Sequence, residues 1–105
     1  MLTLPIKKQW FDMICGGEKK EEYREDTAYY RTRFGKMFDL SDAALSNPTL
    51  QKVSRIALRN GYGTASPTVV ITCLLQLGYG LPEWGAEPGK ISFILRILSV
   101  EDVNA

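Results

Sequence analysis

The sequence predicts an α+β fold that is mainly β, in which about five or six mostly antiparallel strands form a small closed or nearly closed barrel with one or two flanking helices. Three observations predict it. The chain has 105 residues, which is the size of one domain spanning 1–105. Its second half alternates runs rich in Val, Ile and Thr with glycine turns. Several short strands in so short a chain favour a barrel.

The first two elements follow from hydrophobic periodicity. Residues Leu2–Ile6 alternate apolar and other side chains, which predicts a strand, and Pro5 suits an edge or a strand end. Residues Lys8–Cys15 have the period of a helix, with an apolar stripe formed by Trp10, Phe11, Ile14 and Cys15. Gly16-Gly17 predicts the end of that helix, because glycine accepts a left-handed backbone at little cost.

The middle of the chain predicts less regular structure. A short helix is expected over Thr27–Phe34, with Thr27 as its N-terminal cap. Residues 35–50 are expected to be irregular, because glycine, asparagine and proline interrupt them. Within that stretch, Asp39–Leu45 could hold one helical turn.

Three strands are expected in the second half, at Lys52–Arg59, Pro67–Leu77 and Lys90–Val100. The breaks between them are two Gly-Tyr-Gly turns, at Gly61–Gly63 and Gly78–Gly80, and the loop Leu81–Gly89. That loop carries Trp84, which could form a lid or a stacking surface, or a hydrophobic plug at one end of a barrel. Residues 101–105 are expected to fray.

Composition excludes several kinds of chemistry. The chain has no histidine, so Ser-His and Cys-His nucleophile pairs are impossible. The two cysteines, Cys15 and Cys73, lie far apart in apolar contexts, so we expect buried free thiols and no metal site. Neither a phosphate-binding glycine–lysine motif nor a full dinucleotide fingerprint occurs, and no cofactor is expected. A net charge of +1 does not predict strong non-specific binding of nucleic acid.

The sequence also predicts the subcellular location of the protein. Residues 1–6 are too short and are followed by residues too polar to form a signal peptide. No apolar run approaches the roughly 18–20 residues of a membrane span. We therefore expect a cytoplasmic protein with reduced thiols and no membrane partner.

The most informative segment is Gly17–Arg24, which has the pattern Gly-x-Lys-x-x-Glu-x-Arg. If Glu22 to Arg24 is extended, the side chains of Glu22 and Arg24 point to one face of a strand. Lys19, in the preceding turn, could fold back over that face. Lys19 and Glu22 are then the candidate acid–base groups, and Arg24 could orient a ligand by its planar fork. A solvated strand with an internal Glu–Arg pair explains the same spacing.

Two further segments combine aromatic rings with cations. Tyr30 and Arg33 belong to a run in which aromatic residues are interleaved with basic ones, as suits single-stranded nucleic acid. Tyr30 and Phe34 also fall on one helical face, as core residues would. Arg59 and Tyr62 lie in Arg59-Asn60-Gly61-Tyr62-Gly63, which could line a base pocket or could simply be a glycine turn.

The Gly17–Arg24 motif resembles the signature of the ASCH domain family, which is related to the PUA-like barrels of RNA-binding proteins. The resemblance covers roughly residues 2 to 100. Its context is similar to that of short ASCH-like proteins of bacteria and phages at Leu4-Pro5-Ile6, Trp10-Phe11, Asn60-Gly61-Tyr62 and Glu83-Trp84-Gly85. Residues Glu21–Glu25 contain weak strand formers, and the resemblance is what favours a strand there.

The resemblance implies a PUA-like barrel with a cleft lined by Lys19, Glu22 and Arg24. From the pattern of aromatic and basic residues, we expect Tyr30, Arg33, Arg59 and Tyr62 to extend that cleft. The resemblance also implies that this cleft binds RNA or a nucleotide- or nucleobase-type ligand. One branch of the family removes acyl groups from acetylated cytidine. That branch is similar at Lys19 but uses a threonine nucleophile where this chain has Glu22, so the hydroxyl acyl acceptor is missing. Such an amidohydrolase and a ligand-free interaction module are the alternatives.

Overall fold

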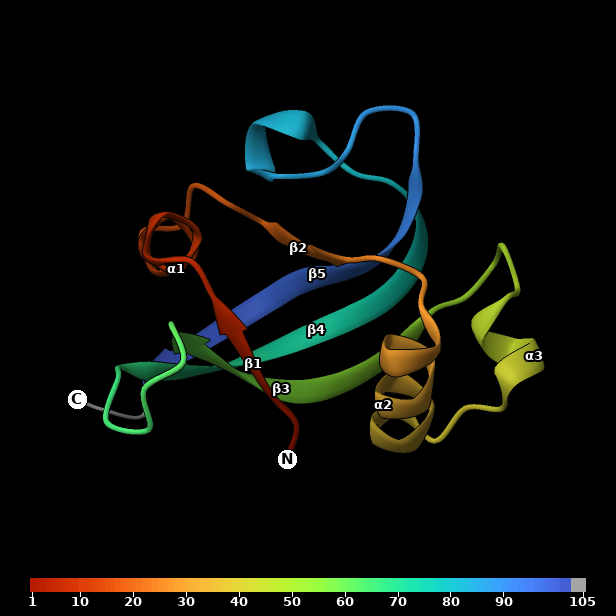
Figure 1. The fold of residues 1–105 in the computed structure, drawn as a ribbon, viewed down its shortest axis with the longest axis horizontal. Coiled ribbons are helices and arrows are strands. Elements are labelled where there is room, and N and C mark those ends of the chain that lie inside the picture. The colour runs from red at the N-terminus through yellow and green to blue at the C-terminus, as the bar shows by residue number, and fades with distance from the viewer. Residues whose placement is uncertain (103–105) are drawn as a thin grey trace.

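The computed structural model describes residues 1–102, and residues 103–105 lie outside the described part. Short helices are interspersed among the strands of a single sheet (Figure 1). The elements are β1 Thr3–Ile6, α1 Lys8–Cys15, β2 Glu21–Arg24, α2 Ala28–Phe38, α3 Asp42–Leu45, β3 Lys52–Asn60, β4 Thr68–Tyr79, the 3-10 turn η1 Pro82–Trp84, and β5 Ile91–Asp102. The predicted α+β class is confirmed.

The five strands form one mixed sheet in the order β1-β3-β4-β5-β2. Strand β1 pairs with β3 in parallel, and the three other pairs are antiparallel. The sheet curls into a half-barrel, with β1 and β2 as its two edges (Figure 1). Among residues 1–102, the two edge strands share no backbone ladder, so the barrel is not closed by main-chain hydrogen bonds.

The helices differ from the prediction mainly in α2, which continues past the expected end at Phe34 to Phe38. Gly35, expected to break regular structure, lies inside this helix. A Cβ on Gly35 would come within 3.0 Å of the Leu40 carbonyl oxygen, so glycine serves there to let the following loop pack closely. The helix ends instead at Asp39, whose φ of 55° is left-handed. Thr27 caps its start as predicted, accepting from the Tyr30 amide at 3.3 Å.

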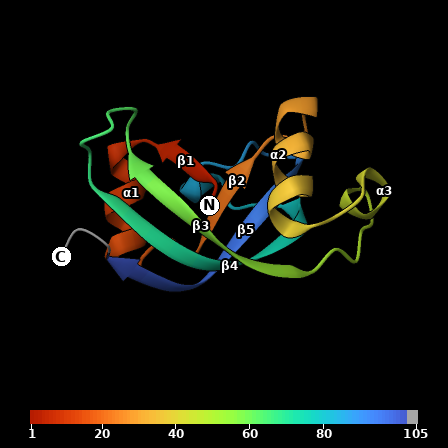
Figure 2. The same ribbon diagram turned by 90° about the horizontal axis from the view of Figure 1, so that it is seen from below.

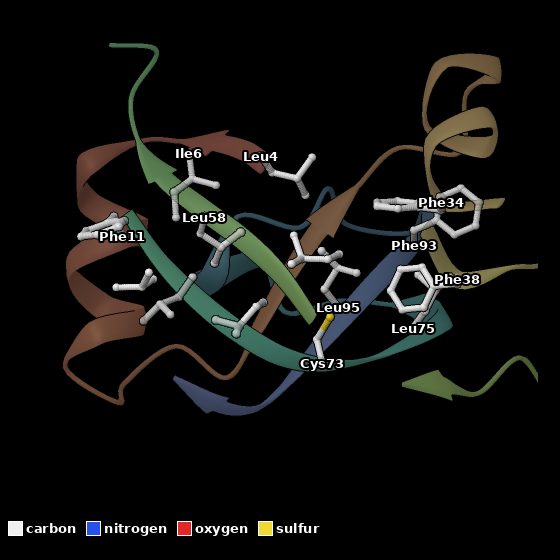
Figure 3. Packing of buried hydrophobic residues seen from close by; sticks show 14 of the residues in the cluster. Leu4, Ile6, Phe11, Phe34, Phe38, Leu58, Cys73, Leu75, Phe93 and Leu95 are labelled. Atoms are coloured by element: carbon white, nitrogen blue, oxygen red, sulfur yellow. The ribbon is translucent and has the colours of Figure 1, made fainter. Parts of the chain in front are cut away.

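The hydrophobic core fills the concave side of the half-barrel. Alternation along β4 buries Val69, Ile71, Cys73 and Leu75 on one face. At one end Phe34 packs edge-on to Phe93, with ring centroids 5.3 Å apart. Helices α1 and α2 lie at opposite ends of this core (Figures 2 and 3). Polar side chains lie instead at the open side of the half-barrel, between β1 and β2.

Two details correct the sequence-based expectations. Cys73 is buried, but Cys15 is exposed, because it lies at the last turn of α1 beyond the buried Phe11 and Ile14. Strand β5 continues through Glu101 and Asp102, so the expected fraying is wrong for those two residues, and the rest of that segment is outside the described part. In the described residues, every helix is too short or too polar to span a membrane.

Candidate functional site

A cleft of about 590 Å³ opens along the gap between the two edge strands. We call it the edge cleft. Its lining comes from Pro5 and Ile6 of β1, Lys7 in the connection, Lys8 and Trp10 of α1, residues 22–24 of β2, Tyr30 of α2, Asn60 of β3 with the following Gly61 and Tyr62, and Trp84 and Gly85 of the η1 loop. Segments distant in sequence therefore meet at one opening, and all but α3, β4 and β5 contribute to it.

Glu22 and Arg24 form the floor of the edge cleft. They pair across the ladder with Leu95 and Phe93, both fully buried, so both side chains point to the concave face as their spacing predicted. An Arg24 Nη1 donates to Glu22 Oε2 and to the Tyr23 carbonyl oxygen, and Nη2 donates to the Pro5 carbonyl oxygen at 3.0 Å. Arg24 thus joins β2 to β1 across the open side of the half-barrel.

Lys19 supports this floor from behind. Its side chain is fully buried, and its Nζ lies 3.2 Å from Glu22 Oε1. The same Nζ donates to the Trp84 carbonyl oxygen at 2.5 Å. It also lies 4.9 Å and 4.8 Å from the ring centroids of Trp10 and Tyr23, where cation–π attraction favours it. Lys19 itself does not line the edge cleft, because its own partners enclose the ammonium group.

The local backbone explains how Lys19 comes to point inward. Gly17 has a φ of +82°, which ends α1 as predicted and reverses the chain. The amides of Glu18 and Lys19 then both donate to the Met13 carbonyl oxygen, at 2.9 and 3.1 Å. This tight closure holds Lys19 beneath Trp10 while Lys20 stays exposed. The motif glycine therefore serves to place the lysine.

Burial changes the ionisation of Lys19. Removal of its ammonium group from water lowers the pKa of Lys19, and Glu22 partly offsets that change by favouring the charged form. The nearby Arg24 guanidinium lowers the pKa of Lys19 further. Two cations and one carboxylate thus share a site with little water around them. Such a cluster fixes the position of the Glu22 carboxylate.

Tyr23 anchors the η1 loop on the opposite face of β2. Its hydroxyl donates to Glu21 Oε1 at 2.8 Å and accepts from the Leu81 amide at 3.0 Å. Burial raises the pKa of Tyr23, so the hydroxyl stays protonated and able to donate. A Cβ on Gly80 would lie 2.4 Å from the Tyr23 ring, so glycine is required for this approach. The loop bearing Trp84 is therefore held by Tyr23 as well as by Lys19.

Tyr30 and Tyr62 join the floor as walls of the edge cleft. Tyr30 stacks on Phe34 at 5.6 Å, and the Arg24 guanidinium carbon lies 5.8 Å from its ring centroid. Tyr30 is thus a half-buried wall fixed on both sides. Tyr62 is 88% exposed and stands at the rim. Tyr30 therefore both packs against the core and lines the edge cleft.

Arg33 and Arg59 do not line the edge cleft. The Arg33 guanidinium carbon lies 3.3 Å from the Tyr29 ring centroid, and the side chain folds back along α2. Arg59 follows the fully buried Leu58 in β3, so strand alternation turns it to the other face. Its Nε is buried without a hydrogen-bond partner in the described part of the chain.

Trp10, Trp84, Lys7 and Lys8 also line the edge cleft, although they were not among the predicted site residues. Trp10 shares an apolar stripe with Phe11, and nothing in that periodicity separates a cleft wall from a core residue. Trp84 stands in a proline- and glycine-rich loop, which was a usable indication of a stacking surface. Lys8 pairs with Asp12 at 2.5 Å, whereas no ion pair is found for Lys7 within residues 1–102.

The residues present favour recognition by hydrogen bonds and stacking. Among residues 1–102, no three His, Cys, Asp or Glu side chains gather closely enough to hold a metal ion. Comparison of the chain with protein-family models, curated proteins and solved structures gives no match. Membership of the ASCH family therefore remains a proposal, and the chemistry of the edge cleft is argued from its own groups.

Proposed function

We propose that this chain is a small PUA-like, ASCH-type protein that binds RNA, or a nucleotide or nucleobase, in the edge cleft. One observation carries the proposal. A Glu22 carboxylate and an Arg24 guanidinium, held against each other, form the floor of a cleft whose walls are aromatic. A nucleobase offers the matching features, which are a polar edge for the floor and a flat face for the rings.

The size of the edge cleft supports a small ligand. Its volume of about 590 Å³ falls within the range of roughly 300–1,000 Å³ that is usual for small-molecule sites. The open cleft also favours a ligand over a module without one, because a purely structural ion pair needs no space beside it. One base, or one nucleotide of a longer RNA, would fit in such a site.

The charge distribution supports a short footprint on RNA. The chain has a net charge of +1, and the cations at the cleft rim are Lys7 and Lys8. Each phosphate that is neutralised releases condensed counterions and adds to the salt dependence of binding. We therefore expect contact with only a few phosphates and a shallow dependence of affinity on salt concentration.

The surroundings of Lys19 argue against the amidohydrolase alternative. A general base must reach the attacking water or the leaving group. Lys19 Nζ instead lies behind Glu22 and donates to the Trp84 carbonyl oxygen. We therefore propose binding rather than hydrolysis.

Titration of short single-stranded RNAs and free nucleosides against the wild type and a Glu22→Ala/Arg24→Ala variant tests the proposal. Loss of two charge-assisted hydrogen bonds predicts binding at least about tenfold weaker. The matched control is Glu18→Ala/Lys20→Ala, which removes two exposed charges from the same segment and should bind like the wild type. Equal affinity of the floor variant and the wild type would refute the assignment.

A second variant covers the case in which the floor variant does not fold. Tyr62 is 88% exposed, so Tyr62→Ala should leave the free energy of unfolding nearly unchanged. Base stacking on an aromatic ring contributes about 1–3 kcal/mol, so its loss predicts an affinity about five- to 150-fold lower. Circular dichroism of each variant shows whether the fold is retained.

A further inference from the structure

We propose that the edge cleft selects a guanine-type base, meaning a ring that presents one acceptor followed by two adjacent donors. The inference rests on the proposed function and specifies its ligand. It follows from the hydrogen-bonding groups that Glu22 and Arg24 still have available after their mutual contacts are counted.

The Glu22 carboxylate keeps acceptor capacity toward the edge cleft. Oε1 faces Lys19 and Oε2 accepts from Arg24. Each oxygen of an ionised carboxylate can accept about two hydrogen bonds, so one remains on each. Glu22 also lines the cleft, although only 4% of the residue is exposed. The floor therefore retains one acceptor position on each of the two neighbouring carboxylate oxygens.

Arg24 places donors next to those acceptors. Its Nη1 is committed to Glu22 and to the Tyr23 carbonyl oxygen, and one Nη2 hydrogen is committed to Pro5. A guanidinium has five N–H groups, so the second Nη2 hydrogen and Nε–H have no hydrogen-bond partner within residues 1–102. Because Arg24 also lines the cleft, the floor presents a donor beside two acceptors.

Guanine alone among the four RNA bases complements this sequence of groups. Its pairing edge carries the O6 acceptor, then the N1–H donor and the N2 amino donor. Adenine and cytosine place a ring-nitrogen acceptor beside their amino group, and that lone pair would face the carboxylate. Uracil has one N–H between two carbonyl oxygens, so it leaves one carboxylate oxygen unpaired and facing an acceptor. A buried acceptor without a hydrogen-bond donor is unfavourable, so each mismatched base should bind more weakly than guanine.

The charge of the floor argues against the other ligands with adjacent donors, which are amidinium and guanidinium cations. Lys19 and Arg24 together outnumber the single Glu22 carboxylate. A further cation would meet net repulsion at short range in a poorly hydrated site. A neutral ring with a carbonyl acceptor for Arg24 avoids that repulsion.

The floor is also rigid enough to discriminate. Lys19 fixes one oxygen of Glu22, Arg24 fixes the other, and the stacked Tyr30 ring lies against Arg24. A site whose groups are held before binding spends little free energy on ordering them, and it adapts poorly to a ligand with a different pattern. A ligand that lacks one donor should therefore lose the whole binding free energy of that hydrogen bond.

The test compares nucleoside 5′-monophosphates, which share one sugar and one phosphate. Guanosine and inosine monophosphates differ only in the N2 amino group. Loss of one hydrogen bond to a charged acceptor predicts that the guanosine compound binds wild-type protein about tenfold or more tightly than the inosine compound. The adenosine, cytidine and uridine compounds should bind more weakly still. Quenching of Trp10 and Trp84, which both line the cleft, supplies the readout.

Equal affinity for the guanosine and inosine compounds, or a preference for another base, would overturn the guanine assignment while leaving nucleotide binding intact. Absence of binding by every monophosphate and every short RNA would overturn both proposals. Glu22→Gln, which turns one acceptor into a donor, should reduce the guanosine-to-inosine affinity ratio to near one. Glu18→Gln, at an exposed position, should retain the ratio. If Glu22→Gln does not fold, the wild-type ratio decides alone.

Discussion

At the scale of single residues, Lys19 shows how a buried charge can organise the floor of a cleft without lining that cleft. Its Nζ connects the Trp84 carbonyl oxygen to Glu22, and two aromatic rings enclose it. Burying a lysine is unfavourable unless it is paired and hydrogen-bonded, and here both conditions are met. Its role is to hold the carboxylate and the η1 loop in place.

Replacing Lys19 by methionine should therefore destabilise the protein. Lys19→Met keeps the apolar stem but leaves the Trp84 carbonyl oxygen and one Glu22 oxygen without their cation. We expect a loss of about 2–4 kcal/mol in the free energy of unfolding, measured by urea denaturation. The matched control is Lys20→Met, next along the chain and exposed, which should change stability by less than about 0.5 kcal/mol. Similar values for the two variants would contradict a supporting role for Lys19.

Cys73 predicts a loss of stability at alkaline pH. Burial raises the pKa of the Cys73 thiol to about 12, whereas an unfolded thiol ionises near its ordinary value of about 8.5. Above that ordinary value the native state holds one proton more than the unfolded state, so stability falls as pH rises toward the native pKa. The expected slope from this group is about 1.4 kcal/mol per pH unit.

Cys73→Ala isolates this effect. At neutral pH the variant should be less stable, because the removed sulfur leaves a cavity in the core. Between about pH 9 and 11 the stability difference between wild type and variant should shrink. Only the wild type has a thiol that ionises in the unfolded state and stays protonated in the native state, so only the wild type loses stability from this group. Tyr23 also titrates in the alkaline range, but it is present in both proteins and cancels in the difference. A constant difference across this range would show that Cys73 is not protected from ionisation.

At the scale of elements, β2 and α2 show different sources of stability. Strand β2 has the sequence Glu-Glu-Tyr-Arg, which is poor in strand formers. Its ladder with β5 and the contacts of Lys19, Tyr23 and Arg24 hold it in place. Helix α2 has a local start signal in Thr27. Local signals therefore explain α2, whereas tertiary contacts explain β2.

Thr27→Ala should weaken the first turn of α2. The Thr27 hydroxyl accepts from the Tyr30 amide, and loss of such a cap costs about 1 kcal/mol. We expect a reduction of that size in chemical denaturation, and faster hydrogen exchange at the Tyr30 amide. Thr27→Ser keeps the oxygen and should stay within a few tenths of a kcal/mol of the wild type. If Ser and Ala have the same effect, the hydroxyl is not acting as a cap.

At the scale of the whole molecule, the sequence predicted the elements better than their arrangement. The strands from Lys52 onward were expected close to where they lie, because Val- and Ile-rich runs between glycines have few other structures available. The parallel pairing of β1 with β3 was not predicted, because no local pattern specifies the partner of an edge strand. The extension of α2 through Gly35 depends on a close approach by Leu40, which is a tertiary contact.

In the candidate site, too, some features could be predicted from local sequence patterns and others depend on tertiary contacts. Alternation along β2 predicted that Glu22 and Arg24 share a face, since it follows from strand geometry alone. The exclusion of Arg59 also follows from alternation, but only once Leu58 is known to point inward. Neither the burial of Lys19 under Trp84 nor the contact of Arg24 with Pro5 could be predicted, because each joins segments whose relative positions the fold decides. Strand periodicity thus places Glu22 and Arg24 on one face, and long-range polar contacts determine the rest of the site's geometry.

Arg24 is the side chain that joins the two edge strands across the open side of the half-barrel. Its Nη2 donates to the Pro5 carbonyl oxygen of β1, while its Nη1 stays with Glu22 of β2. Lysine has a single ammonium group and cannot donate from two separate nitrogens to Glu22 and to the Pro5 carbonyl oxygen at once. Arg24→Lys should therefore loosen β1, and the backbone amides of Ala57 and Gly61 report it, since they donate to the Leu2 and Ile6 carbonyl oxygens.

Loss of one such bond predicts about five- to tenfold faster hydrogen exchange at those two amides, with little change in the β4–β5 ladder. Arg96→Lys, at an exposed position on β5, is the matched control and should leave all of these rates unchanged. A uniform increase over the whole sheet would mean that Arg24 contributes only to global stability. Unchanged rates at Ala57 and Gly61 would mean that β1 is held by its ladder with β3 alone, and that the half-barrel needs no side chain to join its edges.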